Sequence, residues 1–153
     1  MRCDSRRRRR SGATLVETIF VILIFLMLLF GIFEYGRFVM TKQIMENAAR
    51  EGARWAAVHT FSGTTANVQD VVDQKLSSAR SQLVGYNKTT SITVFAADDT
   101  GNPISGALWS DQDFAQGIGV QITGTFKPIL PNLLKMNTSF TITAKSVMQS
   151  EAN

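Results

Sequence analysis

The sequence predicts an α+β protein with a long N-terminal helix, a second amphipathic helix and a small antiparallel sheet of about three strands. Three observations predict this class. An apolar run near the N-terminus is long enough to cross a bilayer, apolar residues continue beyond it at helical spacing, and the C-terminal half changes to a period of two. A chain of 153 residues has room for one modest domain beside such an anchor.

The apolar run covers residues 13–33 and reads ATLVETIFVILIFLMLLFGIF, with Glu17 as its one charged residue. At about 1.5 Å per helical residue the run spans roughly 31 Å, which is about one hydrocarbon thickness. No A-x-A cleavage site follows it, so we expect the run to be retained and not removed as a secretory signal. We assign the transmembrane helix to residues 13–36.

The positive charge of the chain is concentrated at one end. Residues 1–12 hold six Arg against one Asp, whereas residues 13–153 hold ten Lys and Arg against eleven Asp and Glu. A nucleic-acid-binding protein keeps a basic face on its folded domain, so we expect no nucleic-acid partner. Positive residues beside an apolar span resist translocation, and residues 1–12 are therefore predicted to stay in the cytoplasm while the chain beyond the span lies outside the cytoplasmic (inner) membrane. The alternative is an incidental, solvated charge run.

Residues suited to catalysis or metal binding are scarce. His59 is the only histidine, so a metal cluster or a Ser-His-Asp arrangement would have to be built around one loop residue. The acids at 98, 99, 111 and 113 lack the spacing and the closing Glu of a calcium loop, and the residues from Asp98 to Pro103 are typical of a turn. Cys3 is the only cysteine, which leaves no disulfide within the chain. We predict no enzyme activity, no cofactor, no metal and no small-molecule substrate.

The first helix is predicted to continue beyond the membrane. Phe33, Tyr35 and Phe38, beside Glu34 and Arg37, have the composition of an interfacial aromatic belt. Residues 37–58 keep apolar positions at helical spacing without proline, so we assign them to an extracytoplasmic stalk. A helix over residues 13–58 would be roughly 70 Å long, more than a bilayer needs, and such a stalk is suited to packing sideways.

Residues 59–153 are predicted to form an extracytoplasmic α+β domain. An amphipathic helix is expected from an N-cap at Asn67 to about Leu83, followed by strands near residues 92–96, 118–126 and 140–148. The strands alternate apolar and polar residues, so one face of the sheet needs a cover, and the outer half of the stalk can supply it. The apolar segment PILPNLLKM, residues 128–136, is either a loop under the sheet or a contact with a partner.

Glu17 lies inside the apolar run, where a charge costs about 2.5–3.5 kcal/mol at mid-membrane and less near the interface. If the chain were cut after Gly12, the new α-amino group of Ala13 on one subunit could pair with Glu17 on the next. Such a pair would set the axial register of packed helices. The alternative is a Glu that is tolerated at the inner boundary beside the Arg cluster.

Small residues form a second signal in the stalk, because they recur three or four positions apart and let another backbone approach closely. These are Ala49, Gly52, Ala53, Ala56 and Ala57. Gly costs a helix interior about 1 kcal/mol, so a packing role is expected at Gly52. Arg50 and Arg54 are interpreted as solvated or domain-facing, with contacts to a partner as the alternative.

These features resemble the TadE-like pseudopilins of the tight-adherence (Flp, type IVc) pilus system. The matching features are the apolar span that closes in GIFEYGRF at residues 31–38, the block after Glu46, and the C-terminal TGTFKP followed by a last strand. The residues of the block are Asn47, Ala48, Ala49, Arg50, Glu51, Gly52, Ala53 and Arg54.

The resemblance implies a pilin-like fold and a leader that a prepilin peptidase cuts between Gly12 and Ala13, which leaves Glu17 at the fifth mature position. It also implies a minor, non-enzymatic subunit that helps to initiate or support assembly of a thin pilus used in adhesion, secretion or DNA uptake. Its partners would be membrane lipid, other pilin-like subunits and the assembly machinery. Thr18 stands where major Flp pilins carry Tyr, so an uncleaved anchored subunit remains an alternative.

A function of another class is a membrane-tethered extracytoplasmic binding module of the cell envelope, neither cleaved nor associated with a pilus. Such a module should carry a pocket or an apolar patch on its outer domain. A pseudopilin should instead expose the strip of small residues on its stalk.

Overall fold

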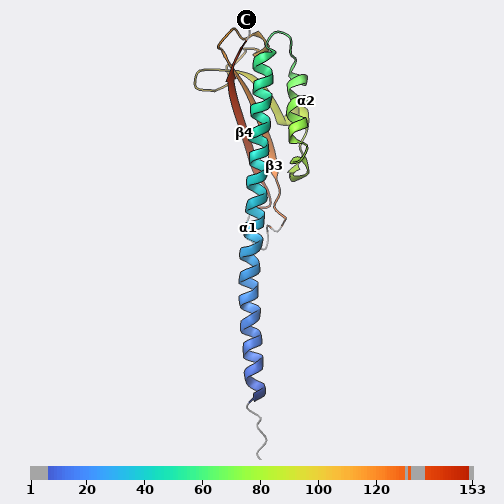
Figure 1. Ribbon diagram of the computed structural model, residues 1–153, viewed down its shortest axis with the longest axis vertical. Coiled ribbons are helices and arrows are strands. Elements are labelled where there is room, and N and C mark those ends of the chain that lie inside the picture. Colours follow the sequence, from blue (N-terminus) through green and yellow to red (C-terminus); the bar gives the residue numbers. More distant parts are fainter. Residues whose placement is uncertain (1–6, 130, 132–136, 152–153) are drawn as a thin grey trace, which may run out of the picture.

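The computed structural model describes residues 7–129, 131 and 137–151, and it shows one long helix with a small domain packed along one end (Figure 1). Residues 1–6 of the predicted cytoplasmic segment and most of the segment 128–136 lie outside the described residues. The α+β class is confirmed. α1, Arg7–Val58, runs for 52 residues and passes from the apolar run into the stalk as a single helix.

From Gly12 to Leu28, α1 is exposed to solvent along all its sides among the described residues. Its large apolar side chains from Leu15 to Ile24 are at least half exposed, and an 18-residue window of mean hydropathy 2.8 has none of its residues buried. A helix that is apolar on all sides requires either lipid or other helices around it. By length and composition α1 is therefore a candidate membrane span.

The C-terminal half of α1 forms part of the domain core. Met45, Ala48, Ala53 and Ala56 are fully buried. They follow one another at helical spacing and face the rest of the domain, so the prediction that the stalk covers the sheet is confirmed.

α2, Thr65–Leu76, begins earlier and ends earlier than the sequence predicted. Its N-cap is Thr64, whose hydroxyl accepts a hydrogen bond from the backbone N–H of Asn67 at 3.3 Å, so the predicted cap residue lies in the first turn of the helix. The chain leaves the helix after Leu76 and reaches the sheet through a 3-10 turn, which corrects the predicted end at Leu83.

The remaining elements are short turns and an antiparallel sheet. They are η1 Arg80–Gln82, β1 Leu83–Val84, α3 Lys88–Ser91, β2 Ile92–Ala97, η2 Trp109–Asp111, β3 Gly117–Phe126 and β4 Phe140–Gln149. β4 pairs with β3 over ten residues, and β2 and β1 follow each other along the opposite edge of β3. The sheet therefore has four strands where about three were predicted, because the two-residue β1 carries too little pattern to be read from sequence.

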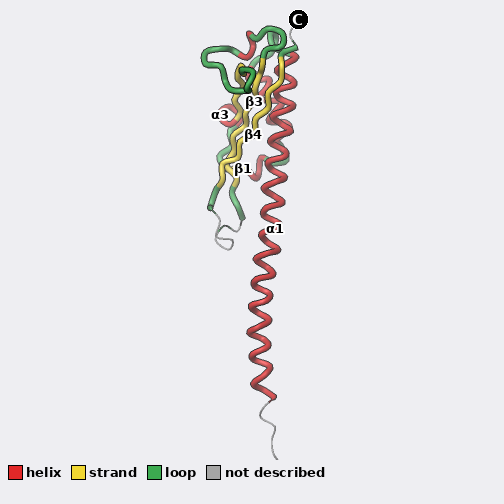
Figure 2. Tube along the Cα trace, turned by 90° about the vertical axis from the view of Figure 1, so that its left-hand side faces the viewer, coloured by secondary structure: helices red, strands yellow, loops and turns green. Residues whose placement is uncertain are grey.

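One face of the sheet is covered and the other is open. On the covered face Ile118, Val120, Ile122 and Ile142 are buried against the two long helices. α1 lies over β3 and β4, and α2 lies beside α1 (Figures 1 and 2). The fold thus has two layers, with the helices on one side only.

α1 packs tightly against α2 at Gly52. A Cβ atom added there would overlap Cγ2 of Val72 on α2 and lie 3.5 Å from Cγ1 of Val120 on β3. We predict that Gly52→Ala lowers the free energy of unfolding by about 1–2 kcal/mol, since overpacking costs about 1–3 kcal/mol and the better helix propensity returns at most about 1 kcal/mol.

The matched control is Gly36→Ala on the same helix, where an added Cβ meets no atom within 4 Å. This control should be neutral or stabilising by up to about 1 kcal/mol. Denaturant unfolding of the full chain in detergent, followed by tryptophan fluorescence, measures both. Equal stability of the two variants would contradict the tight contact.

Candidate functional site

Gly12, Ala13 and Glu17 lie on the exposed N-terminal part of α1. Glu17 follows Ala13 by four residues, so the two positions are one turn apart on the same side of the helix. Among the residues whose side chains the structure describes, from Gly12 onward, no Lys, Arg or His forms an ion pair with Glu17. A partner for this carboxylate would therefore come from outside those residues, and its register role stays a prediction.

The block from Asn47 to Arg54 is divided between two faces of α1. Ala48, Ala49, Gly52 and Ala53 are buried, whereas the other residues face outward or are half-buried. The buried residues meet α2 and β3 of the same chain, so the expectation of an exposed strip is wrong. Sequence spacing showed that a backbone would come close, but it could not show that this backbone belongs to the same chain.

The outward face of the stalk is polar. Exposed side chains follow one another at helical spacing from Met40 through Gln43, Asn47, Arg50 and Arg54. Arg50 lies 3.9 Å from a carboxylate oxygen of Glu46, and Arg54 lies 3.1 Å from one of Glu51. Exposed ion pairs of this kind contribute only about 0.2–1 kcal/mol to stability. These arginines can therefore exchange their partners for other groups at little cost.

Arg37 joins α1 to the end of the domain nearest the apolar half of that helix. Its guanidinium donates hydrogen bonds to Glu34 at 2.5 Å, to the carbonyl of Lys127 at 2.8 Å and to the side chain of Gln82. It also lies 4.6 Å from the ring centre of Phe126. One side chain of α1 thereby holds η1 and the end of β3 at a fixed height on the helix.

The side chains of the predicted aromatic belt divide between the surface and the domain. Phe33 and Tyr35 are each 69% exposed, and their place in an interfacial belt stays a prediction. Phe38 instead points into the domain and packs edge-to-face on Phe126, with ring centres 5.6 Å apart. Glu34 is likewise buried, and it also accepts a hydrogen bond from the backbone N–H of Ile129 at 3.3 Å. The Glu34–Arg37 spacing was visible in the sequence, but the long-range partners were not.

The end of the domain farthest from the span carries exposed apolar side chains that sequence reasoning missed. They are Val58, Phe61, Leu108 and Phe114. Each lies in a loop or at a helix end, where no helical or strand period shows which side chains are exposed. His59 stacks on Trp55 with ring centres 4.1 Å apart, so it belongs to the packing at this end.

The acids near residue 98 form a turn, as predicted. The carboxylate of Asp98 accepts hydrogen bonds from Thr100 Oγ1 and from the backbone N–H of Asn102, both at 2.7 Å. These hydrogen bonds, that of Thr100 first, hold the pKa of Asp98 below its usual value. Among the described residues no group of three His, Cys, Asp or Glu is placed to hold a metal ion.

The Arg37 contacts predict a measurable coupling between span and domain. Arg37→Ala removes hydrogen bonds that a charged donor makes to three acceptors, so we expect a loss of about 2 kcal/mol and faster amide exchange at Phe126 and Ile129. Hydrogen exchange of the full chain in detergent measures this effect. Arg50→Ala is the control, and its exposed pair should cost less than about 0.5 kcal/mol. An effect of Arg37→Ala no larger than the control would contradict the coupling.

Residues 12–54, which form the span and the stalk up to the end of the small-residue block, match a family model described as TadE-like protein. No curated protein matches the chain, and no solved structure matches it. The match covers the closing motif of the apolar run and the block after Glu46, and the resemblance drawn from the sequence is confirmed. The third feature, the C-terminal TGTFKP, lies outside the matched residues. The N-terminal part of this chain, residues 12–54, is TadE-like.

Proposed function

We propose that the chain is a minor pseudopilin, a non-enzymatic structural subunit that helps to assemble a tight-adherence (Flp-type) pilus. The observation that carries the proposal is the division of α1 into a bare apolar half and a half embedded in a folded domain. The TadE-like match over residues 12–54 supports it, because this family is associated with the Tad pilus as a structural component. The subunit is anchored in the cytoplasmic membrane, with its Arg-rich end in the cytoplasm and its domain outside.

A bare apolar helix suits a subunit that passes from lipid into an assembly. The same surface that meets acyl chains can meet the helices of neighbouring subunits, since lipid tails are as apolar as leucine and little is lost in the exchange. The described residues of the domain leave this surface open, because their contacts with α1 begin near Gly31 and Glu34. Pilin-like subunits and the prepilin peptidase are the partners that this proposal names.

The outward face of the stalk continues this surface outside the membrane. The small residues are occupied within the chain, so a neighbouring subunit would meet the polar face that contains Gln43, Asn47 and Arg50. Contacts of this polarity suit reversible association, since the side chains remain hydrated in the free subunit.

A membrane-tethered binding module is the second candidate, and one observation favours it. Phe61, Leu108 and Phe114 are exposed on the outer domain, whereas the strip of small residues is not. Exposed apolar side chains at the end of a domain are typical of contact with another molecule. Cleavage of the leader distinguishes the two candidates, because only the pseudopilin requires it.

The pseudopilin proposal requires that the leader be cut after Gly12. Mass spectrometry of the protein extracted from membranes should show a mature chain that begins at Ala13, since cleavage after Gly12 removes the Arg-rich segment. A Gly12→Leu variant should retain residues 1–12, because a large side chain replaces the small one at the cut. An intact Arg-rich N-terminus in the unmodified protein would support the binding module instead.

The proposed register role of Glu17 can be tested separately from cleavage. Glu17→Ala should leave insertion into the membrane unchanged, because it removes a charge from the span, but it should reduce co-purification with pilin-like partners about tenfold if one ion pair of about 1.4 kcal/mol is lost. Thr18→Val is the control, since it changes the next residue without changing a charge. Normal co-assembly of the Glu17→Ala protein would remove the proposed register role.

A further inference from the structure

β4 is an edge strand, and the hydrogen bonds of the sheet show which of its backbone groups are free. The backbone N–H of Ile104 donates to the carbonyl of Ala96 at 2.8 Å, so Ala96 on β2 directs its backbone groups away from β3. Its partner Ile118 on β3 is therefore bonded on the opposite side, to Met148 on β4, because hydrogen-bonded and non-bonded pairs alternate in antiparallel ladders.

The same alternation extends along the whole of β4. Ser150 donates its N–H to the carbonyl of Gln116 at 2.7 Å, which continues the pattern in which even-numbered residues bond to β3. The odd-numbered residues direct their N–H and C=O groups to the free edge. They are Thr141, Thr143, Lys145, Val147 and Gln149. No backbone hydrogen bond from other described residues reaches them. A row of unpaired groups of this length is a template for another strand.

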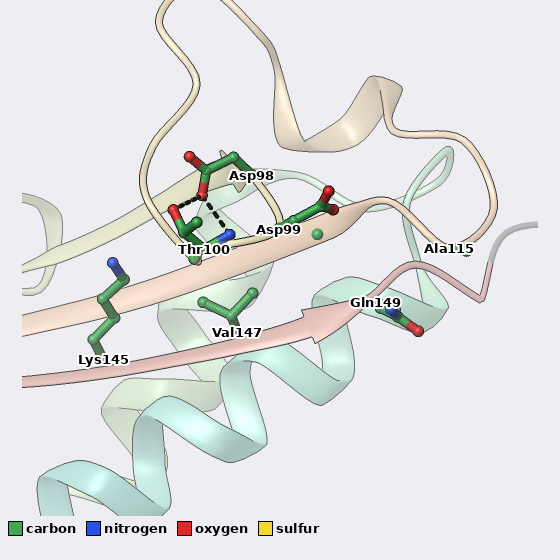
Figure 3. Close-up of a pocket in the computed structure, with 9 residues that line it drawn as sticks. Asp98, Asp99, Thr100, Ala115, Lys145, Val147 and Gln149 are labelled. Atoms are coloured by element: carbon green, nitrogen blue, oxygen red, sulfur yellow. Dashed lines mark hydrogen bonds between the residues drawn. The ribbon is translucent and has the colours of Figure 1, made fainter.

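A cleft of about 660 Å³ lies beside the end of β4 on the open face of the sheet. Its floor includes Val147 and its wall is the turn from Asp98 to Gly101, which Figure 3 shows above the strands. A Cβ atom added at Gly101 would lie 3.4 Å from Val147, so the turn is close to the strand. Side chains at the free edge that point to this face would meet the acids of the turn.

In the segment that contains the turn beside β4, all charged residues are negative. Residues 89–126 contain four Asp and no Lys or Arg. The carboxylate of Asp98 is already engaged by its own turn, whereas Asp99 is exposed and forms no ion pair with the described residues. Lys145 lines the same cleft, with its ammonium 5.5 Å from the ring centre of Phe95. Two Asp and one Lys line the cleft, so its charged side chains sum to −1, and a basic group is favoured beside Asp99.

A second cleft, of about 380 Å³, lies on the other face of β4 against the end of α1. Ala57, Phe114 and Met148 give it apolar walls. Phe114 is 70% exposed, and the next residue, Ala115, has a φ of 65°, a conformation that costs a residue with a Cβ about 1–2 kcal/mol. The N–H of Ala115 donates to the carbonyl of Ser150 at 3.0 Å, so the strained turn is tied to the end of β4. The side chain of Phe114 is therefore exposed to solvent beside the free edge.

We propose that the free edge of β4, from Lys145 to Gln149, binds an extended peptide segment of a partner protein as an added strand. Successive side chains of a strand point to opposite faces. The bound segment alternates basic residues, which lie over the acidic cleft, with apolar residues, which enter the cleft beside Phe114. Backbone hydrogen bonds supply affinity, and the two clefts supply selectivity. This inference does not depend on the pilus role.

A second copy of the chain fits this edge less well. β4 runs from Phe140, near the Arg37 end of the domain, toward Ser150, near the end of α1, so it has the same direction as α1. Two copies anchored in one bilayer would therefore pair their β4 strands in parallel, which is the less stable arrangement. A peptide from a partner has no such restriction.

The test uses the full chain in a zwitterionic detergent and a fluorescent decapeptide that alternates Lys with Val. A peptide of the same composition, with its Lys and Val in separate blocks, is the control. We expect saturable binding with about tenfold preference for the alternating peptide, and slower amide exchange at Lys145, Val147 and Gln149 when it is bound. Fluorescence anisotropy measures affinity, and NMR-detected exchange measures the amides.

Two variants sharpen the test. Val147→Pro removes an N–H that faces the free edge and spares the bonds to β3, so it should weaken binding about tenfold. Val147→Thr keeps this N–H and the branched shape, and it should bind within about twofold of the unmodified protein. Phe114→Ser removes the apolar wall without changing the backbone of β4, so it should also weaken binding of the alternating peptide. This variant tests the proposal if the proline variant does not fold.

Three results would overturn the proposal. The first is equal binding of the alternating and blocked peptides, and the second is unchanged amide exchange at Val147 in the bound unmodified protein. The third is exchange at these amides that slows with protein concentration in the absence of peptide, because a second copy would then occupy the edge.

Discussion

The domain depends on the close contact that α1 makes with α2 and β3 at Gly52. A two-layer fold with a single sheet must cover one apolar face with its helices, and here only two long helices are present to do so. A side chain at this position would overlap Val72, so the absence of a Cβ is what lets α2 lie beside α1 over the sheet. The buried alanines on the same face extend this contact along the helix. The stalk is therefore part of the core as well as an extension of the span.

The contacts of Arg37 place that core at a defined height on α1, next to the apolar half of the helix. The same residue bonds to Glu34 on α1, to Gln82 on η1 and to the carbonyl that follows β3. A force or displacement of the apolar half of α1 is thus passed to the sheet through a charged, partly buried cluster and through the packed helix itself. This arrangement suits the proposed subunit, because the contacts of Arg37 and of the packed helix link the apolar half of α1 to the outer domain.

Three surfaces remain available for other molecules, and they differ in chemistry. The apolar half of α1 is suited to lipid or to neighbouring helices, the polar face of the stalk to adjacent subunits, and the edge of β4 to an extended peptide. They occupy different parts of the molecule, so one subunit can use all three at once.

The sequence alone determined the span, the continuation of its helix and the strand pattern, because these depend on hydrophobic content and on local periods of 3.6 and 2. It also determined the TadE-like character of residues 12–54. Only the tertiary structure decided that the small residues pack within the chain, that Phe38 turns toward Phe126, and that Thr64 caps α2. It alone showed the free edge of β4. Apart from the local cap at Thr64, each of these depends on which distant segments meet, and a local pattern specifies that a surface must be covered without specifying what covers it.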